Sequence, residues 1–441
     1  MQSSKYPMEQ RTVNRSATRL FLLCFLSYAC SYIGRKNFSA CLPAMISEGF
    51  LTKSFGGYIT TAYMIVYGAG QLFSGIIGSR VKPKYMIGTG LLGAGLCNIF
   101  MGLVPYATVL PVIWAANGLF HSMLWAPILR VFTDLLPEER RSSAGTNISA
   151  SCSIGAVLAF LIPAILLKFS HWRTVFSVSG ALLLVMFLIW VIGNRTLDKY
   201  IQMMEQACLT ERRTACDSSV TLNHVEKLKT KHFLPVVIIT SGLWLSLFSL
   251  ICNGALRDAV ESWAPTFLSE QFHLGSSMAA LISVIIPIVS VTGTYISNWL
   301  FERHIHNEVY TAGVMFVAAT LCVAGIYLTK ENSVILCALF MAASVTAMWG
   351  ANHMFLTVVP YHFAPLGLSA AVTGFLNSVI YFATAICSGI YGVLAENFGW
   401  DKLVLIWLGI GIAGIVFSIL GGKLWGISKK SLRGDRRNEA T

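Results

Sequence analysis

The chain has 441 residues, of which 55% are hydrophobic and 12% are charged, and its mean hydropathy is +0.66. A soluble domain is about a quarter charged, so this composition excludes an ordinary soluble fold and predicts a protein that crosses the membrane many times. The formal net charge of +12 does not indicate a nucleic-acid partner, because the basic residues lie mostly in connections and tails between apolar runs. We expect a monomer in the lipid bilayer, with no nucleic acid bound.

Twelve apolar segments are long enough to cross the membrane, since a helix needs about 20 mostly apolar residues to span the hydrocarbon core. The first is not followed by a small-residue cleavage site, so we interpret it as a retained helix rather than a signal peptide. The expected spans are 17–47, 55–79, 84–104, 107–134, 143–168, 172–193, 233–269, 277–301, 308–329, 333–358, 369–394 and 401–424.

One long polar stretch separates the first six spans from the last six. Basic residues concentrate in this stretch, in both tails and in two short connections on the same side. Because such residues stay on the cytoplasmic side, both termini are expected to be cytoplasmic, and a bacterial inner membrane is the expected location. The predicted parts are an N-terminal six-helix half at 1–193, a cytoplasmic linker at 194–232, a C-terminal six-helix half at 233–424 and a basic cytoplasmic tail at 425–441.

The two halves share a sequence repeat. RKNFSACLPAMISEGF at 35–50 aligns with RDAVESWAPTFLSEQF at 257–272, and SHWRTVFS at 170–177 echoes NFGWDKLV at 397–404 more weakly. Two parallel six-span repeats, with a substrate site near the midplane between them, are typical of major facilitator transporters. We therefore predict an all-α membrane protein with twelve helices in two pseudo-symmetric halves. One spacing of 222 residues, 35 to 257, relates Arg35 to Arg257, Pro43 to Pro265, Ser47 to Ser269, Glu48 to Glu270 and Phe50 to Phe272.

Two arginines inside the predicted spans give the strongest indication of a site. A charge at the centre of a membrane helix costs about 2.5–3.5 kcal/mol, so it is kept for a function or a partner. Thirteen residues separate Arg35 from Glu48, and the same number separate Arg257 from Glu270. At 1.5 Å per residue this places both arginines about 20 Å from the outer ends of their helices. We predict that they face each other and bind an anion with several oxygens through bidentate contacts.

Neighbouring charges leave two points open. Asp258 follows Arg257 directly and Glu261 lies one turn further along the helix, so these acids could neutralise Arg257 in place of a substrate. Lys36 lies about 100° around the helix from Arg35. It either pairs with an acid on another helix or reaches an aqueous surface.

Further polar residues share helix faces with the arginines, among them the Tyr28, Tyr32 and Arg35 stripe. We interpret the intramembrane histidines as hydrogen bonders between helices, with proton sites as the alternative. No metal-ligand cluster or catalytic residue is expected, and no cofactor. The predicted substrate-binding residues are Arg35, Arg257, Tyr28, Tyr32, Tyr67 and Gln71, and a coupling or secondary site is predicted among Asp258, Glu261, His121, Asn253 and His353.

The segment YACSYIGRKNFSACLP at 28–43 resembles the first-span signature of the organophosphate:phosphate antiporter family of the major facilitator superfamily. LRDAVESWAPTFL at 256–268 is similar to its seventh-span motif, and three further segments are similar to its second and fourth spans and its last connection. The family includes glycerol-3-phosphate and hexose-phosphate transporters. The resemblance implies that Arg35 and Arg257 bind phosphate, that Tyr28, Tyr32 and Tyr67 border the site, and that an organic phosphate exchanges for inorganic phosphate.

Five positions depart from the family pattern. Gln71 stands where well-known members have a lysine, Cys152 or Ser151 where one carrier has a histidine, and Ser79 where a loop aspartate is usual. Asp258 and Glu261 add acids where uncharged residues are expected. These changes lower the positive charge of the site, so a sugar phosphate, a carboxylate and a zwitterion all stay open as substrates.

The leading expectation is therefore a secondary transporter of a small organic anion, with inorganic phosphate or protons as the coupled species. The alternatives are a transporter-like sensor of a sugar phosphate and a proton-coupled transporter of a carboxylate or zwitterion. An enzyme is not expected, because the sequence has no phosphate-cradling P-loop and no nucleophile elbow.

Overall fold

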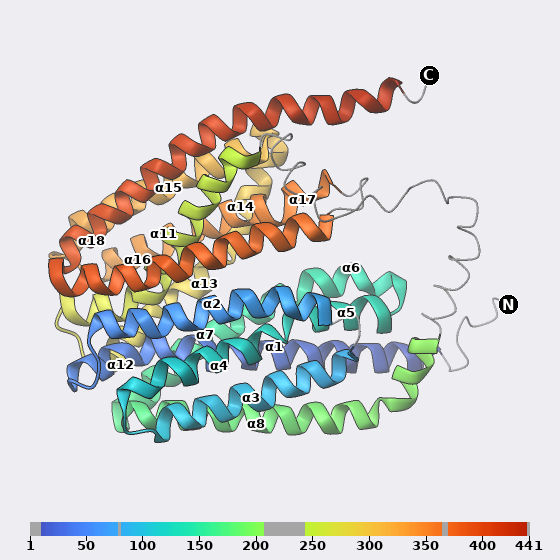
Figure 1. Ribbon diagram of the computed structural model, residues 1–441, viewed down its shortest axis with the longest axis horizontal. Coiled ribbons are helices and arrows are strands. Elements are labelled where there is room, and N and C mark those ends of the chain that lie inside the picture. The colour runs from blue at the N-terminus through green and yellow to red at the C-terminus, as the bar shows by residue number, and fades with distance from the viewer. Residues whose placement is uncertain (1–9, 78–80, 207–242, 364–368, 439–441) are drawn as a thin grey trace.

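The computed structural model describes residues 10–77, 81–206, 243–363 and 369–438, and it contains only helices and their connections there (Figure 1). The helices before the central gap are α1 (Gln10–Ser47), α2 (Lys53–Ile77), α3 (Pro83–Leu103), α4 (Leu110–Ser122), α5 (Trp125–Leu135), α6 (Glu138–Asn147), α7 (Ser149–Phe169) and α8 (Trp172–Thr196). Those after it are α11 (Leu243–Gln271), α12 (Ser276–Ser283), α13 (Ile285–Ser290), α14 (Thr292–Leu300), α15 (Glu308–Thr329), α16 (Val334–His353), α17 (Val359–Tyr361) and α18 (Ser369–Asn438).

The described helices account for all twelve predicted spans. Ten stretches are long and apolar enough to cross a membrane, of which Val372–Ile427 is one continuous stretch of 56 residues. Gly399 has a φ of 75° inside α18 and so divides this stretch into two arms at a position that favours glycine. Counting the arms separately and adding α2 gives twelve crossings, which confirms the predicted all-α membrane fold.

The helix ends differ from the predicted boundaries in several places. α8 continues to Thr196, and residues 198–206 are also helical, because the Tyr200 side chain is buried there and donates a hydrogen bond to the Leu135 carbonyl at 2.8 Å. α18 runs on to Asn438, past the predicted end of the last span at 424. Positions 207–232 of the predicted linker and 233–242 of the predicted seventh span lie outside the described residues, as does Ser79.

Helices α1 to α8 form one group in Figure 1 and helices α11 to α18 form a second. The two groups meet at the left of the view and diverge toward the right, where α1 starts and α18 ends. The two groups are therefore close together at one end and farther apart at the other.

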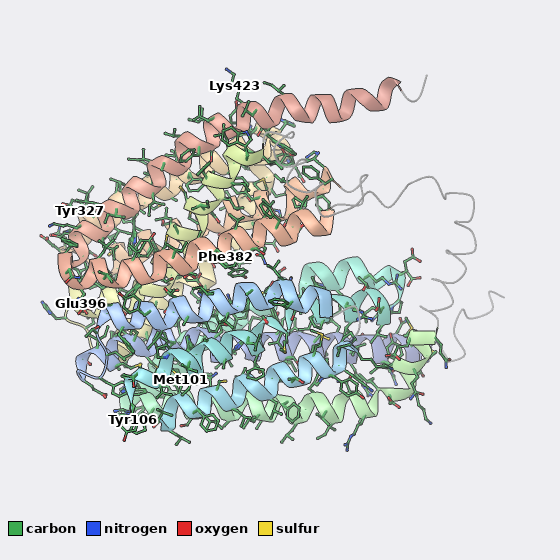
Figure 2. All side chains as sticks on the ribbon, viewed as in Figure 1. Met101, Tyr106, Tyr327, Phe382, Glu396 and Lys423 are labelled. Atoms are coloured by element: carbon green, nitrogen blue, oxygen red, sulfur yellow. The ribbon has the colours of Figure 1, made fainter. Side chains whose placement is uncertain are left out.

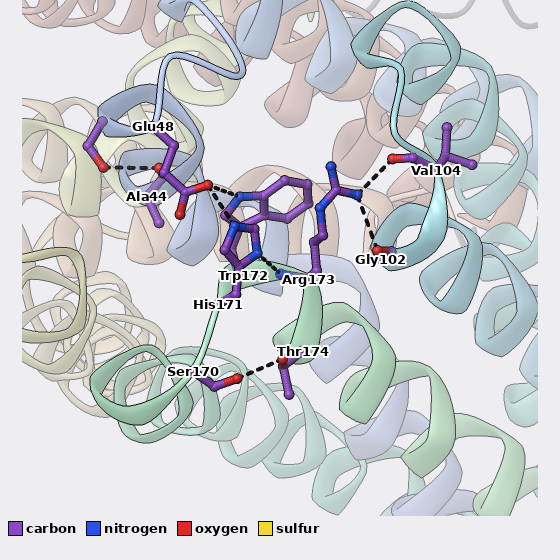
Figure 3. Close-up of polar contacts among 10 residues, drawn as sticks. Ala44, Glu48, Gly102, Val104, Ser170, His171, Trp172, Arg173 and Thr174 are labelled. Atoms are coloured by element: carbon purple, nitrogen blue, oxygen red, sulfur yellow. Dashed lines mark hydrogen bonds and ion pairs between the residues drawn. The ribbon is translucent and has the colours of Figure 1, made fainter.

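A glutamate at the end of the first span accepts a hydrogen bond from a tryptophan in both groups, and this contact accounts for part of the sequence repeat. At the end of α1, Glu48 Oε2 accepts hydrogen bonds from Trp172 Nε1 at 2.8 Å and lies 2.7 Å from His171 Nε2 (Figure 3). At the end of α11, Glu270 Oε2 accepts from Trp400 Nε1 at 2.8 Å. Each glutamate thus ties the first span of its group to the start of the last span, which explains why Glu48 and Glu270 match.

The two groups of helices contact each other at the end where they meet. We call this region the closed end and define it by Lys53, Ser54, Glu270 and Glu396. Lys53 Nζ lies 2.8 Å from Glu270 Oε2, and the Ser54 backbone N–H donates to Glu396 Oε2 at 2.7 Å. Glu396 is labelled at this end in Figure 2. A Cβ on Gly57 would lie 2.7 Å from the Ser388 carbonyl oxygen, so α2 and α18 approach as closely as only glycine permits.

Because Lys53 and Glu270 are partly exposed, with 18% and 30% of their side chains accessible, their contribution is modest. We nevertheless expect the double variant Lys53→Met/Glu270→Gln to loosen the closed end. Amide hydrogen exchange in the first turn of α2 and the last turn of α11 should rise several-fold by mass spectrometry. Lys168→Met, which changes an exposed lysine at the end of α7, should leave exchange there unchanged. Unaltered exchange in the double variant would contradict a gating role for this pair.

Candidate binding cavity

A cavity of about 380 Å³ lies between the two groups of helices and receives side chains from both. This volume falls within the range of small-molecule sites. Its lining from the first group includes Tyr28, Tyr32, Arg35, Lys36, Tyr67, Gln71 and Trp125, and its lining from the second group includes Arg257, Asp258, Glu261, Trp349, His353, Asn377 and Tyr381. Nine of the eleven residues predicted for the site therefore line one cavity.

Arg35 reaches the cavity from the middle of α1 and is held there by tyrosines. Its Nη1 donates to the Tyr67 hydroxyl oxygen at 3.2 Å, and its guanidinium carbon lies 4.3 Å from the centre of the Tyr67 ring. Tyr32 presents a second ring at 5.6 Å. These contacts orient the guanidinium through its hydrogen bond and its cation–π attraction. Nε of Arg35 is buried and has no hydrogen-bond partner among the described residues.

Arg257 occupies the matching place on α11. Its guanidinium carbon lies 4.7 Å from the centre of the Trp349 ring, which α16 supplies. Among the described residues, no carboxylate lies within ion-pair distance of either arginine, since Asp258 and Glu261 are both directed at another cation. The sequence alternative, in which the two acids neutralise Arg257, is therefore wrong.

That other cation is Lys36, whose role the sequence leaves open. Its Nζ lies 3.1 Å from Glu261 Oε1 and 3.6 Å from Asp258 Oδ1, and about 9% of its side chain is exposed. The ion pair joins α1 to α11 and so crosses between the two groups. We call Lys36, Asp258 and Glu261 the charge cluster. With Arg35 and Arg257, the cavity carries three positive and two negative side chains, a formal charge of +1.

A chain of hydrogen bonds connects the second group to Arg35 through Gln71. Asn377 Nδ2 on α18 donates to Gln71 Oε1 at 3.3 Å, and Gln71 Nε2 donates to the Tyr67 hydroxyl at 2.7 Å. The Tyr67 oxygen accepts from both Gln71 and Arg35, so its own hydrogen is directed elsewhere. Gln71 thus places an uncharged amide where the family resemblance leads one to expect a lysine.

Tyr28 completes the predicted stripe on α1 and packs against aromatic neighbours. Its ring centre is 5.6 Å from Tyr32 and 4.9 Å from Trp125. His353 lines the cavity at the point where α16 passes into a π-helical turn at Met354–Val358. Turns of this kind are frequent at functional sites.

Two predicted residues lie outside the cavity lining and connect helices instead. The ring nitrogens of His121 lie 2.9 Å from the Asn117 carbonyl oxygen and 2.8 Å from the Ser31 carbonyl oxygen, which ties α4 to α1. Asn253 Nδ2 donates to the Met348 carbonyl at 2.8 Å and ties α11 to α16. Both side chains are buried, so hydrogen bonding between helices is the role that their surroundings support.

Sequence reasoning missed four lining residues that contact predicted site residues: Trp125, Trp349, Asn377 and Tyr381. Tyr381 makes an edge contact with Tyr67 at 4.9 Å between ring centres. Of these four residues, Asn377 could have been predicted. It is a polar amide within a predicted span, and polar groups are costly to bury in lipid. The aromatic residues carry no such signal in a sequence where 12% of residues are aromatic.

Comparison with known proteins is consistent with this architecture. The family model of the Major Facilitator Superfamily matches residues 24–386. A probable hexose phosphate transport protein of Chlamydia muridarum is 24% identical over 94% of this chain and 92% of its own length. The glycerol-3-phosphate transporter of Bacillus subtilis is 24% identical over 95% and 94%, and the membrane sensor protein UhpC of Escherichia coli is 22% identical over 90% of each chain.

Solved structures support the fold. The crystal structure of the nucleoside transporter NupG superposes with a TM-score of 0.69 at 12% identity, and the match covers 92% of this chain and 98% of that one. Together with the sequence relatives, this match confirms the predicted fold and the resemblance to organophosphate transporters.

Proposed function

The chain belongs to the Major Facilitator Superfamily, and we propose that it transports a small organic anion, a phosphate ester, in exchange for inorganic phosphate. The relatives named as hexose phosphate and glycerol-3-phosphate transporters support the phosphate ester as the substrate class. We further propose that residues 1–193 and 233–424 act as two halves that move relative to each other.

The observation that carries this proposal is the state of the two arginines. Arg35 and Arg257 come from opposite halves, line the same cavity and lie against aromatic rings, with no carboxylate within ion-pair distance among the described residues. Their guanidinium groups therefore keep their charge and donors available for the oxygens of an anion. A phosphate group matches this pair, because each guanidinium can bind two of its oxygens side by side.

The closed end supports movement by alternating access. In the present state the halves touch at Lys53–Glu270 and their helices diverge toward the side where α1 begins and α18 ends, and we propose that the substrate enters the cavity from that side. We propose that this is the cytoplasmic side of a bacterial inner membrane, in line with the basic residues in the connections. Transport then requires the closed end to separate while the opposite ends approach.

Exchange in liposomes tests the proposal. Purified protein is reconstituted into vesicles loaded with radiolabelled inorganic phosphate, and glycerol-3-phosphate or glucose-6-phosphate is added outside. We expect rapid loss of label that depends on the external ester. Loss of label that does not respond to any phosphate ester would overturn the assignment.

The sensor hypothesis keeps one supporting observation, the similarity to the membrane sensor protein UhpC. The same vesicle experiment distinguishes a sensor from an exchanger. Ester binding that raises the thermal stability of the protein without any loss of label would favour the sensor. A carboxylate substrate driven by protons would instead give uptake without internal phosphate.

A further inference from the structure

We propose that the charge cluster of Lys36, Asp258 and Glu261 binds one proton when a doubly charged phosphate ester enters the cavity and releases it when the ester leaves. This inference rests on the proposed function, because it assigns a second ligand to the same cavity. It explains how a site with a formal charge of +1 accommodates a dianion.

The cluster is short of positive charge. One ammonium serves two carboxylates, at 3.1 Å and 3.6 Å, and all three residues are 6–7% exposed. The three side chains together therefore have a formal charge of −1. The cluster thus offers one carboxylate that has no cation of its own.

An unpartnered oxygen marks where the proton is accommodated. Asp258 Oδ2 is buried and has no hydrogen-bond partner among the described residues, although Oδ1 of the same carboxylate faces Lys36. A buried carboxylate oxygen without a donor is costly. Protonation of the pair removes one negative charge and so lowers that cost.

The groups that face the cluster do not supply the missing charge. α1 contributes Arg35 beside Lys36, and α11 contributes Arg257 beside the acids, but these guanidinium groups lie over Tyr67 and Trp349. α2 contributes Tyr63, α16 contributes His353, and α18 contributes Tyr381, Cys387 and Tyr391. None of these is an additional fixed cation within ion-pair distance of the acids among the described residues.

Charge balance links the proton to the substrate. A phosphate monoester loses its second proton near pH 6, so at pH 8 about 99% of it is doubly charged. A cavity of +1 leaves such a complex with one excess negative charge in a poorly solvated site. One proton taken from bulk water onto the carboxylate pair brings the complex to neutrality, and it returns to water when the ester dissociates.

Calorimetric titration at pH 8 tests this inference with glycerol-3-phosphate as the probe. Comparing buffers of different ionisation enthalpy gives the number of protons taken up per ester bound. We expect about one proton for the wild type and close to none for Asp258→Asn and Glu261→Gln. Linkage also requires the wild-type affinity to fall about tenfold per pH unit across this range, whereas the affinities of the variants should stay nearly constant.

Two comparisons locate the proton. Glu331→Gln changes an exposed glutamate with 72% of its side chain accessible, and it should still show about one proton. The phosphorus NMR shift of the bound ester should be that of the dianion, and a bound monoanion would overturn the inference. Ester binding without proton uptake, or uptake that persists in both cluster variants, would also overturn it while leaving the arginine site intact. No ester binding at all would instead overturn the proposed function.

Discussion

Replacing either cavity arginine by lysine is expected to reduce ester-driven phosphate exchange roughly 100-fold, although each variant keeps the charge. Hydrogen bonds to charged groups contribute about 1.5–3 kcal/mol, and 1.4 kcal/mol corresponds to a factor of ten. A lysine cannot reproduce the planar pair of donors or the stacking of Arg35 on Tyr67 and of Arg257 on Trp349. Initial rates in phosphate-loaded vesicles, normalised to reconstituted protein, give the measurement.

A control substitution at another arginine shows whether the loss of exchange is specific to the two cavity arginines. Arg195 lies near the end of α8 and is exposed, so Arg195→Lys should exchange phosphate at the wild-type rate. Thermal unfolding of all three variants checks that the protein is intact. Near-normal exchange by both Arg35→Lys and Arg257→Lys would contradict a two-arginine phosphate site.

Removal of Lys36 is expected to give the largest loss of stability among single substitutions in the cavity. Lys36→Met leaves Asp258 and Glu261 buried without their cation. Breaking a buried ion pair by removing one partner costs about 3–5 kcal/mol. We expect a loss in the lower part of that range, because the acids can bind a proton once the lysine is gone. The free energy of unfolding in detergent, from denaturant titration followed by tryptophan fluorescence, reports the change.

The triple variant Lys36→Met/Asp258→Asn/Glu261→Gln distinguishes lost charge balance from lost packing. It removes the acids together with the lysine, so it should recover most of the stability that Lys36→Met loses. Lys402→Met, at an exposed lysine of α18, should stay within about 0.5 kcal/mol of the wild type. A triple variant as unstable as the single one would show that the lysine stem, not its charge, stabilises this contact.

The prediction that Arg35 and Arg257 face the same cavity has a physical basis. Charged residues inside apolar spans are costly, and a repeat at one spacing places Arg35 and Arg257 at equal depth in two helices. The same reasoning explains why Tyr28, Tyr32, Tyr67 and Gln71 reach the cavity, since they share helix faces with an arginine or with each other. Helix periodicity is therefore sufficient to predict which of these residues on α1 and α2 line the cavity.

Contacts between distant helices could not be predicted in this way. The pairing of Lys36 with Asp258 and Glu261 depends on how α1 and α11 are rotated against each other, and a single sequence does not specify that rotation. For the same reason the sequence leaves open whether the acids pair with Arg257, their neighbour in the chain. His121 and Asn253 share faces with polar residues, yet their side chains bond to the backbones of α1 and α16 rather than line the cavity.

The charged side chains of the cavity are arranged in two ways. Lys36 pairs with the acids and so connects α1 to α11, and Arg35 and Arg257, which we propose bind an anion, have no carboxylate within ion-pair distance among the described residues. The closed end acts separately, since Lys53 and Ser54 bind Glu270 and Glu396 at the ends of their helices. In the proposed alternating access, movement between states breaks the closed end, and the charge cluster lies beside the proposed anion site.

The two-arginine site can be checked by locating a bound anion. Arsenate has the shape and charge of phosphate, and its arsenic atom can be located by anomalous diffraction from crystals of the protein soaked in it. The account predicts one strong peak in the central cavity, within hydrogen-bonding reach of both Arg35 and Arg257. A peak that contacts neither arginine, or a cavity that stays without a peak at saturating arsenate, would contradict it.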